Sequence, residues 1–177
     1  MKRLTQPKLF ESDMDRSAEF SPCRMWRYSL YRCWDWQGPE GTLAFCCLNP
    51  SGADERLDDN TVTRCIRYAK RWGFGGFCMY NVFGFRATDP KVMQAAADPV
   101  GPGNDEALAG IRKRAGCVVA GWGNHCPPER EKAVCGLIGG SIFCLNQTQK
   151  GRPIHPLYQK LTETRKLFYD ETNAIVQ

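Results

Sequence analysis

Polar side chains able to bind a ligand or carry a proton stand at or near the ends of four apolar segments of the chain. In chain order they are Asn49, Asn81, the pair Asn124 and His125, and His155. An amide group both donates and accepts hydrogen bonds, and an imidazole gains and loses a proton near neutral pH. If the four segments are neighbouring parallel strands, their carboxyl ends meet in one crevice, where open α/β sheets bind ligands. The sequence therefore predicts a single ligand site built from these five residues.

The four apolar segments are predicted to be buried strands. Each is a short run of apolar residues without alternation, which is typical of a strand covered on both faces. Pro50 ends the first run, because proline cannot donate a hydrogen bond to a sheet. The predicted strands are residues 42–48, 76–83, 117–120 and 142–145.

Three helices are predicted in the connections between these strands. Apolar residues at helical spacing indicate a helix over 61–72. Asn104 is expected to be the N-cap of a second helix over 104–114, and two prolines open a third over 127–137. Strands that alternate with helices predict an α/β fold of three layers, α/β/α, around a central, mainly parallel four-stranded sheet.

The chain of 177 residues suits one domain. Residues 1–22 are polar and mixed in charge, and we expect a loosely held N-terminal arm there. Residues 23–160 are expected to form a single α/β domain, in which the aromatic-rich segment 25–36 favours a strand near a sheet edge. Residues 161–177 are expected to be a C-terminal tail.

Composition and charge narrow the class of protein. The net charge is +5, from 24 Lys and Arg against 19 Asp and Glu, which permits an anionic partner such as nucleic acid. No apolar stretch approaches the roughly 20 residues needed to cross a bilayer. The N-terminus also lacks the apolar core of a secretory signal. We therefore expect a cytoplasmic protein without membrane association.

The ten cysteines carry no close Cys-x-x-Cys spacing, so neither a metal site nor a cofactor is expected. Disulfides are rare in the cytoplasm, and most of the thiols lie inside apolar runs, where they behave as small hydrophobes. An acidic run at 54–59 is interpreted as a solvated loop rather than as a metal-dependent nuclease site. One metal alternative stays open, a set assembled from Cys23, Cys33, His125, Cys126 and Cys135.

Four short motifs occur in the order found in the uracil-DNA glycosylase-like superfamily. The segment Leu48-Asn-Pro-Ser51 resembles its first motif, in the form with Asn that its mismatch-specific branch carries. Met79-Tyr-Asn-Val-Phe83, followed by Arg86, resembles the strand whose terminal Asn binds the pyrimidine edge. Val118-Val-Ala-Gly-Trp-Gly-Asn124 is similar to the segment before the last helix, and His155-Pro156 resembles the closing motif.

This resemblance implies a uracil-DNA glycosylase-like fold and the hydrolysis of an N-glycosidic bond. Asn49 would position a water molecule, or the ligand, below C1′ of a flipped nucleotide. Asn81 would read the amide edge of the base. His155 would stabilise negative charge on the departing base. The implied substrate is a modified or mismatched pyrimidine in DNA, in repair or modification. The other expected substrate-binding residues are Pro50, Ser51, Phe83, Phe85, Arg86, Trp122, Asn124 and His125.

Longer phrases resemble a bacterial and phage family known only as domain of unknown function 1643. They are Leu48-Asn-Pro-Ser-Gly-Ala-Asp54, Phe85-Arg-Ala-Thr-Asp-Pro90 and Ala120-Gly-Trp-Gly-Asn-His125. After His155-Pro156 the chain continues with Leu157 and Tyr158 instead of the serine-containing wedge of the glycosylases. Two alternatives stay open: an enzyme of the same fold acting on a free nucleotide or nucleoside, and a non-catalytic module that binds a base or nucleic acid.

Overall fold

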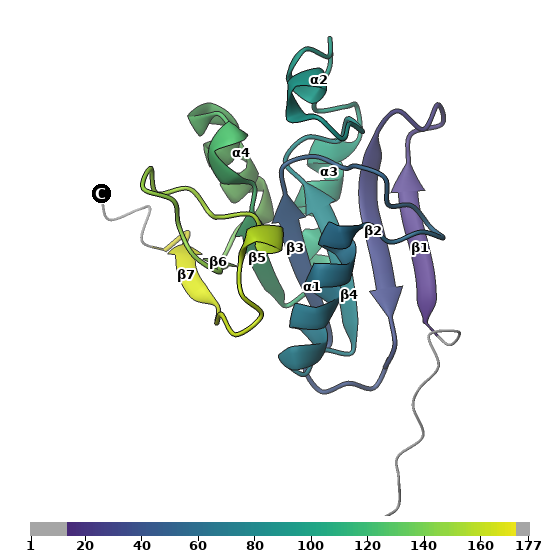
Figure 1. Cartoon of the computed structure of the whole chain (residues 1–177), viewed down its shortest axis with the longest axis vertical. Coiled ribbons are helices and arrows are strands. Elements are labelled where there is room, and N and C mark those ends of the chain that lie inside the picture. Colours follow the sequence, from purple (N-terminus) through teal and green to yellow (C-terminus); the bar gives the residue numbers. More distant parts are fainter. Residues whose placement is uncertain (1–13, 173–177) are drawn as a thin grey trace, which may run out of the picture.

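A computed structural model describes residues 14–172, which form one seven-stranded sheet with helices on both faces (Figure 1). The strand order is β1-β2-β4-β3-β5-β6-β7. The strands are β1 (Asp15–Phe20), β2 (Arg27–Cys33), β3 (Thr42–Cys47), β4 (Gly76–Asn81), β5 (Cys117–Gly121), β6 (Ile142–Cys144) and β7 (Lys166–Tyr169). The helices are α1 (Asn60–Arg71), α2 (Pro90–Gln94), α3 (Asn104–Ala109) and α4 (Pro128–Ile138).

The four predicted strands are confirmed as the parallel centre of the sheet, β4-β3-β5-β6. The prediction of only four strands is wrong, because β1 and β2 on one side and β7 on the other extend the sheet with antiparallel pairs. The segment 25–36 supplies β2, as expected, but β1 is the edge strand on that side.

Two of the added strands lie where loose segments were expected. Strand β1 falls within the expected arm 1–22, and β7 falls within the expected tail 161–177. Residues of β1 alternate between exposed and half-buried, and β7 is only half-buried at its end. Edge strands of this kind bury little apolar surface, so their sequences carry a weak strand signal. The rest of the arm and of the tail, residues 1–13 and 173–177, lies outside the described residues.

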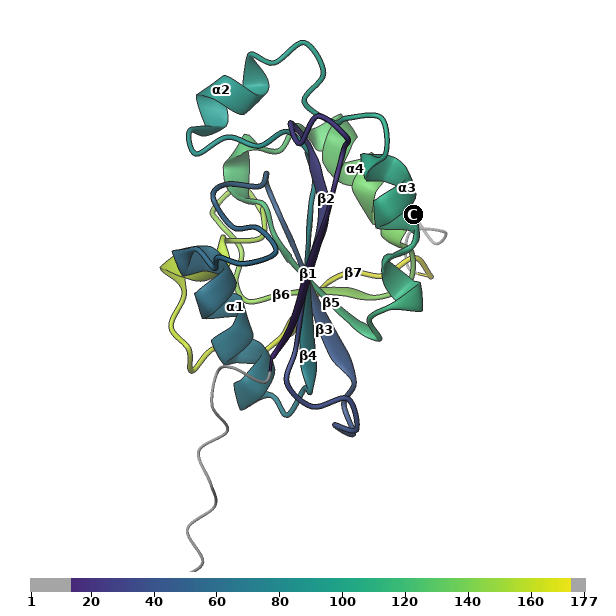
Figure 2. The ribbon, with the colours of Figure 1, turned by 90° about the vertical axis from the view of Figure 1, so that its right-hand side faces the viewer.

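The sheet is the middle of three layers, with α1 on one face and α3 and α4 on the other (Figure 2). Alternate side chains of β3 enter the two cores. Phe45 packs with Tyr68 of α1 and with Trp72, the C-cap of that helix, whereas Cys46 belongs to the core beneath α3 and α4. A fully buried strand needs such apolar cover on both faces. The expected helices 61–72 and 127–137 are confirmed as α1 and α4 with small shifts at their ends.

The second predicted helix is shorter than expected. Helix α3 ends at Ala109, and a separate 3₁₀ turn follows over Ile111–Lys113. Asn104 is not the N-cap, since its side chain is buried and donates from Nδ2 to the carbonyls of Asn81 and Val82, both at 3.1 Å. Its amide therefore fixes the carboxyl end of β4. The short helix α2 was not predicted.

Four arginines from the β1–β2 hairpin hold down the loop 53–59, and we call them the arginine clasp. They are Arg16, Arg24, Arg27 and Arg32. The exposed pair is Arg24 with Glu55, at 2.9 Å. Arg27, which is 1% exposed, donates from Nη1 to the Ala53 carbonyl at 2.9 Å. The interpretation of this acidic run as a merely solvated loop is therefore wrong.

Arg32 makes the most extensive contacts of the clasp and is fully buried. Its Nε donates to Asp58 Oδ1 at 2.8 Å, and its Nη2 donates to the Asp54 carbonyl at 2.6 Å. Asp58 also pairs with Arg16 of β1 at 2.9 Å. A buried guanidinium is stable only when its donors and its charge are matched in this way. The clasp thus fixes the loop between β3 and α1.

The cysteines differ sharply in accessibility. Of the ten, only Cys23 is exposed. The hydroxyl of Ser21, 3.4 Å from the sulfur, and the backbone at Met25 lower the pKa of the Cys23 thiol. Because the thiolate is the reactive form, we expect iodoacetamide to alkylate Cys23 rapidly in the native protein and the other nine only after denaturation. Mass spectrometry of peptides after a short pulse checks this, and a second fast-reacting thiol would contradict the burial described.

Candidate functional site

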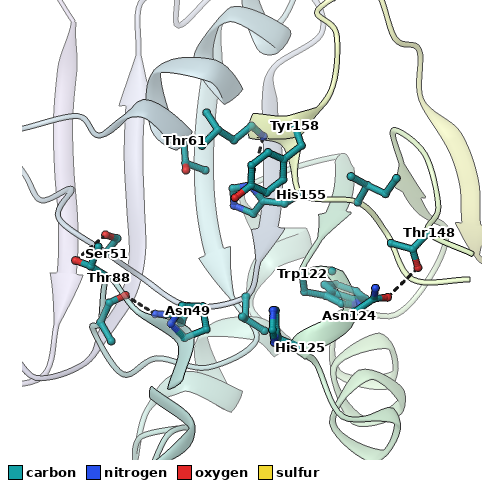
Figure 3. A pocket seen from close by; sticks show the side chains of 16 residues that line it. Asn49, Ser51, Thr61, Thr88, Trp122, Asn124, His125, Thr148, His155 and Tyr158 are labelled. Atoms are coloured by element: carbon teal, nitrogen blue, oxygen red, sulfur yellow. Dashed lines mark hydrogen bonds between the residues drawn. The ribbon is translucent and has the colours of Figure 1, made fainter. Parts of the chain in front are cut away.

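A pocket of about 460 Å³ opens where β3 and β5 end (Figure 3). The chain leaves β3 toward α1 on one face of the sheet and leaves β5 toward α4 on the other. Ligands of open α/β sheets bind at such a divergence, and the volume lies within the roughly 300–1,000 Å³ of small-molecule sites. Residues that line it are Leu48, Asn49, Ser51, Thr61, Ala87, Thr88, Pro90, Trp122, Gly123, Asn124, His125, Thr148, Ile154, His155, Leu157 and Tyr158.

The structure brings six of the expected site residues together in this pocket: Asn49, Ser51, Trp122, Asn124, His125 and His155. The chain has two histidines, and both line it. His155 lies on one side with Tyr158, and Asn49 and His125 lie on the other (Figure 3). The pocket therefore combines two imidazoles with amides and hydroxyls from loops that are distant in sequence.

Asn49 is held by the loop that follows β4. Its Nδ2 donates to the Ala87 carbonyl at 2.7 Å and to the Pro50 carbonyl at 3.1 Å. The Ala87 amide in turn donates to the Pro50 carbonyl at 2.9 Å. Because both amide hydrogens face the backbone, the Oδ1 atom is the part of Asn49 that can accept a hydrogen bond from a ligand or a water molecule.

His155 is the N-cap of a 3₁₀ turn, Pro156–Tyr158, which contacts α1 and forms one wall of the pocket. The Leu157 amide donates to Nδ1 at 3.3 Å, so the neutral form of the ring carries its proton on Nε2. The ring centroids of His155 and Tyr158 lie 5.7 Å apart. Pro156 is buried against Gly121 of β5, so the turn is fixed directly on the sheet.

A buried pair of thiols lies beneath His155. The Cys65 thiol, and then the imidazole of His155, stabilise the thiolate of Cys47 and lower its pKa to about 6 despite burial. Burial lowers the pKa of His155, but the Cys47 thiolate and the charge of Asp59 raise it by more, so the net direction is upward. The Leu157 contact is long and opposes protonation of Nδ1 only weakly. Cys47 therefore favours a cationic His155.

The opposite wall of the pocket is formed by Trp122, Asn124 and Thr148, and hydrogen bonds fix these side chains in place. Trp122 is 1% exposed, and its Nε1 donates to Glu131 at 2.6 Å. Glu131 also forms an ion pair with Arg152. Thr148 donates from its hydroxyl to Asn124 Oδ1 at 2.8 Å, which leaves the Asn124 amide hydrogens available. This wall presents donors to the pocket.

Asn81 is not brought to the pocket, although the sequence predicted it there. It pairs in register with Cys47, so it lies within the sheet rather than beyond its edge. The side chain is 1% exposed, and its Oδ1 accepts from Arg27 Nη2 at 3.0 Å. Its Nδ2 has no hydrogen-bond partner among residues 14–172. The sequence could not show that an arginine two strands earlier in the chain covers this amide.

Four other expected residues also lie outside the pocket lining. Pro50 is buried in the strand-end turn. Phe83 packs below Arg130, with 5.9 Å from the guanidinium carbon to the ring centroid. Phe85 meets the Trp26 ring edge-on at 6.1 Å. Arg86 lies in a neighbouring hollow. Neither phenylalanine is therefore placed to stack on a ligand in the pocket.

Sequence reasoning missed several residues of the lining. Thr61 in the first turn of α1, and Thr88 and Thr148 in two loops, contribute hydroxyl groups. Isolated threonines carry no distinctive signal. The sequence placed Tyr158 only at the position where the glycosylases have a wedge, yet it lines the pocket and is 78% exposed. Its position three residues after His155 was the available signal.

Within residues 14–172, no three His, Cys, Asp or Glu side chains are grouped so that they could hold a metal ion. The alternative set that includes Cys23 and Cys135 is therefore not assembled. The same part of the chain contains no helix long and apolar enough to span a membrane.

Gly121 lies where the pocket turn approaches the sheet. A Cβ atom there would lie 2.7 Å from Cδ of Pro156, a ring that cannot rotate away. We expect Gly121→Ala to lower the free energy of unfolding by about 1–3 kcal/mol, as overpacking does. Urea denaturation followed by circular dichroism measures this change.

The matched control is Gly136→Ala on the exposed face of α4, where a Cβ meets nothing within 4 Å. We expect this variant to gain about 0.5–1 kcal/mol, because alanine is the better helix former. Equal effects of the two substitutions would show that Pro156 does not press on Gly121.

Comparison with known proteins identifies a family. A family model described as "Protein of unknown function (DUF1643)" matches residues 27–157. The match covers β2 to β6 and the lining of the pocket except Tyr158. No curated protein and no solved structure matches the chain.

Proposed function

The chain belongs to the DUF1643 family of proteins of unknown function, and from its pocket we propose that it hydrolyses the N-glycosidic bond of a modified or mismatched pyrimidine in DNA. The observation that carries this proposal is the composition of the pocket. Both histidines line it, together with amide and hydroxyl side chains that include Asn49, Ser51 and Asn124. Among residues 14–172, no Asp, Glu, Lys or Arg does so. Such a lining suits an uncharged heteroaromatic ring with donors and acceptors on its edge.

The proposed reaction uses groups on both sides of the pocket. Asn49 Oδ1 accepts a hydrogen bond from a water molecule and orients it toward C1′. The C1′–N bond breaks with its electron pair leaving on the base, and the water oxygen bonds to C1′. His155 stabilises the negative charge on the base, and its raised pKa favours the cationic form that does so best. The proton of the water passes to His125 or to solvent.

The resemblance to the uracil-DNA glycosylase-like superfamily supports the same reaction. Its four motifs fall at or just beyond the ends of β3, β4 and β5 and in the loop after β6, which are adjacent parallel strands. The role of base reader is reassigned, since Asn81 is buried under Arg27. We assign it to Asn124, whose amide hydrogens are available on the wall opposite His155.

A base-release screen tests the proposal. Oligonucleotides that carry uracil, mismatched thymine or modified pyrimidines are incubated with the protein, and abasic sites are cleaved with alkali. We expect strand breaks on at least one base, their loss in Asn49→Ala, and full activity in Gly136→Ala, which lies away from the pocket.

Two outcomes would overturn the proposal in different ways. Release of base from free nucleosides or nucleotides but from no oligonucleotide would show a nucleotide-processing enzyme. No release from any substrate by the folded protein would leave a binding module without catalysis.

A further inference from the structure

Two further hollows adjoin the pocket through shared lining residues, and we call the pocket with these two hollows the groove. The Arg86 hollow, of about 420 Å³, shares Ser51, Ala87 and Thr88 with the pocket. The Lys150 hollow, of about 390 Å³, shares Asn124 and His125 with it. Figure 3 shows Ser51 and Thr88 at one end of the pocket and Asn124 at the other. The hollows therefore flank the pocket on opposite sides.

Charge is distributed unevenly along this groove. The central pocket has no Lys or Arg, whereas Arg24 and Arg86 line one hollow and Lys150 and Arg152 line the other. No carboxylate lines any of the three within residues 14–172. This holds although the chain carries 19 Asp and Glu. The groove is thus uncharged, apart from its histidines, in the middle and cationic at both ends.

The cations of the Arg86 hollow are held in place by an aromatic ring. The guanidinium carbons of Arg24 and Arg86 lie 4.0 and 5.0 Å from the ring centroid of Phe20. Arg86 Nη1 donates to the Arg24 carbonyl at 3.3 Å. Arg24 pairs with Glu55, but Arg86 has no carboxylate within 4.0 Å among the described residues. Arg86 therefore offers a charge that an anion can use.

At the other end, Lys150 is exposed and makes no ion pair within residues 14–172. It lies in a turn closed by the Thr148 amide, which donates to the Arg152 carbonyl at 2.8 Å. Arg152 is already paired with Glu131. Each end of the groove thus has one unpaired cation, Arg86 or Lys150.

Tyr158 adds an apolar surface at the mouth of the central pocket. Its ring is 78% exposed, while the turn that carries it is fixed by the buried Pro156. A planar ring held at the edge of a pocket is a stacking surface for a base.

We propose that this groove binds a single strand of nucleic acid, with one unpaired base in the central pocket and the phosphates on its two sides at Arg86 and Lys150. An uncharged aromatic centre between two anions is the chemistry of such a strand. A mononucleotide has phosphate on one side only and can use one end. A paired base would first have to leave its duplex, at a cost of a few kcal/mol. The inference deepens the proposed function by naming its substrate class and rests on the same pocket.

Fluorescence anisotropy of a labelled oligodeoxythymidylate, titrated with the protein at several salt concentrations, tests the groove. We expect Arg86→Gln and Lys150→Gln each to weaken binding and to lower the slope of log K against log salt by about 0.7, with additive effects in the double variant. Arg71→Gln is the matched control, since Arg71 is an exposed cation in the last turn of α1, away from the groove. It is expected to leave both quantities unchanged.

Three results would each contradict single-strand binding in the groove. Arg86→Gln and Lys150→Gln could bind like Arg71→Gln, a duplex could bind as tightly as the single strand, or thymidine monophosphate could compete as well as the oligonucleotide. Because Lys150 is exposed, its variant keeps the test valid even if Arg86→Gln folds poorly.

The experiments distinguish a failure of the strand-binding proposal from a failure of the proposed hydrolysis. Strand binding with the expected variant effects, but no base release, would sustain the groove and reject the reaction. Base release from oligonucleotides, with Arg86→Gln and Lys150→Gln binding the strand as Arg71→Gln does, would sustain the reaction and reject the groove.

Discussion

His155→Ala is expected to lower the rate of base release about 10²–10³-fold, the effect of removing a group that stabilises a developing anion. The side chain lies in the pocket, and the turn that bears it is held by Pro156, so the substitution should not unfold the protein. Single-turnover rates on the substrate found by the screen measure the loss. Oligonucleotide affinity should change little, because His155 acts on the departing base.

The pH dependence gives a second readout of the same residue. The folded protein raises the pKa of His155, so the imidazolium is present below that pKa and is lost as the pH rises through it. Activity should therefore fall on the alkaline side. Cys47→Ser removes the thiolate that favours the cation and is expected to move this fall to lower pH. An unchanged profile in Cys47→Ser, or His155→Ala with full activity, would refute the assigned roles.

Arg32→Leu is expected to reduce the free energy of unfolding by about 3–5 kcal/mol, as the loss of one partner of a buried ion pair does. The variant leaves Asp58 with Arg16 alone and removes the donors to the Asp54 and Leu57 carbonyls. The total stability of a domain is only about 5–15 kcal/mol, so much of it would be lost. Urea denaturation followed by circular dichroism gives the difference.

Arg24→Ala is the matched control within the same clasp. Arg24 and Glu55 are 50% and 41% exposed in their side chains, and solvent screens an exposed pair, so we expect its loss to change the free energy of unfolding little. If the two arginine variants were equally stable, burial of Arg32 would not set the strength of the clasp.

The parallel centre of the fold could be predicted because each of its strands is a continuous apolar run. The position of the pocket followed from the same prediction, since strands such as β3 and β5 bring Asn49 and His125 to one edge. Asn81 does not reach the pocket, because it pairs with Cys47 inside the sheet and its side chain accepts a hydrogen bond from Arg27. Pairings between residues distant in sequence leave no local pattern.

The edge strands and the arginine clasp escaped prediction for related reasons. Strands β1 and β7 bury little apolar surface, so their sequences carry a weak strand signal. The acidic run 54–59 has the composition of a solvated loop, and only the tertiary structure shows that arginines of the β1–β2 hairpin bind it. Tyr158 is similar, since a tyrosine in a loop shows its exposure only once the turn is built. Ion pairs and exposed rings follow from tertiary structure.

The arginine clasp also has a consequence for the order of folding. The clasp joins the β1–β2 hairpin to the loop after β3, and β4 lies between β2 and β3, so the clasp contacts form only once β2 and β3 have both paired with β4. The loop 53–59 would then close late, downstream of the rate-limiting step. We therefore expect Arg32→Leu to speed unfolding and to leave the refolding rate nearly unchanged, as stopped-flow denaturant jumps can measure. Slower refolding would instead place the clasp in the folding nucleus. If the clasp closes late, the segment between the pocket residues Ser51 and Thr61 is among the last parts of the molecule to become ordered.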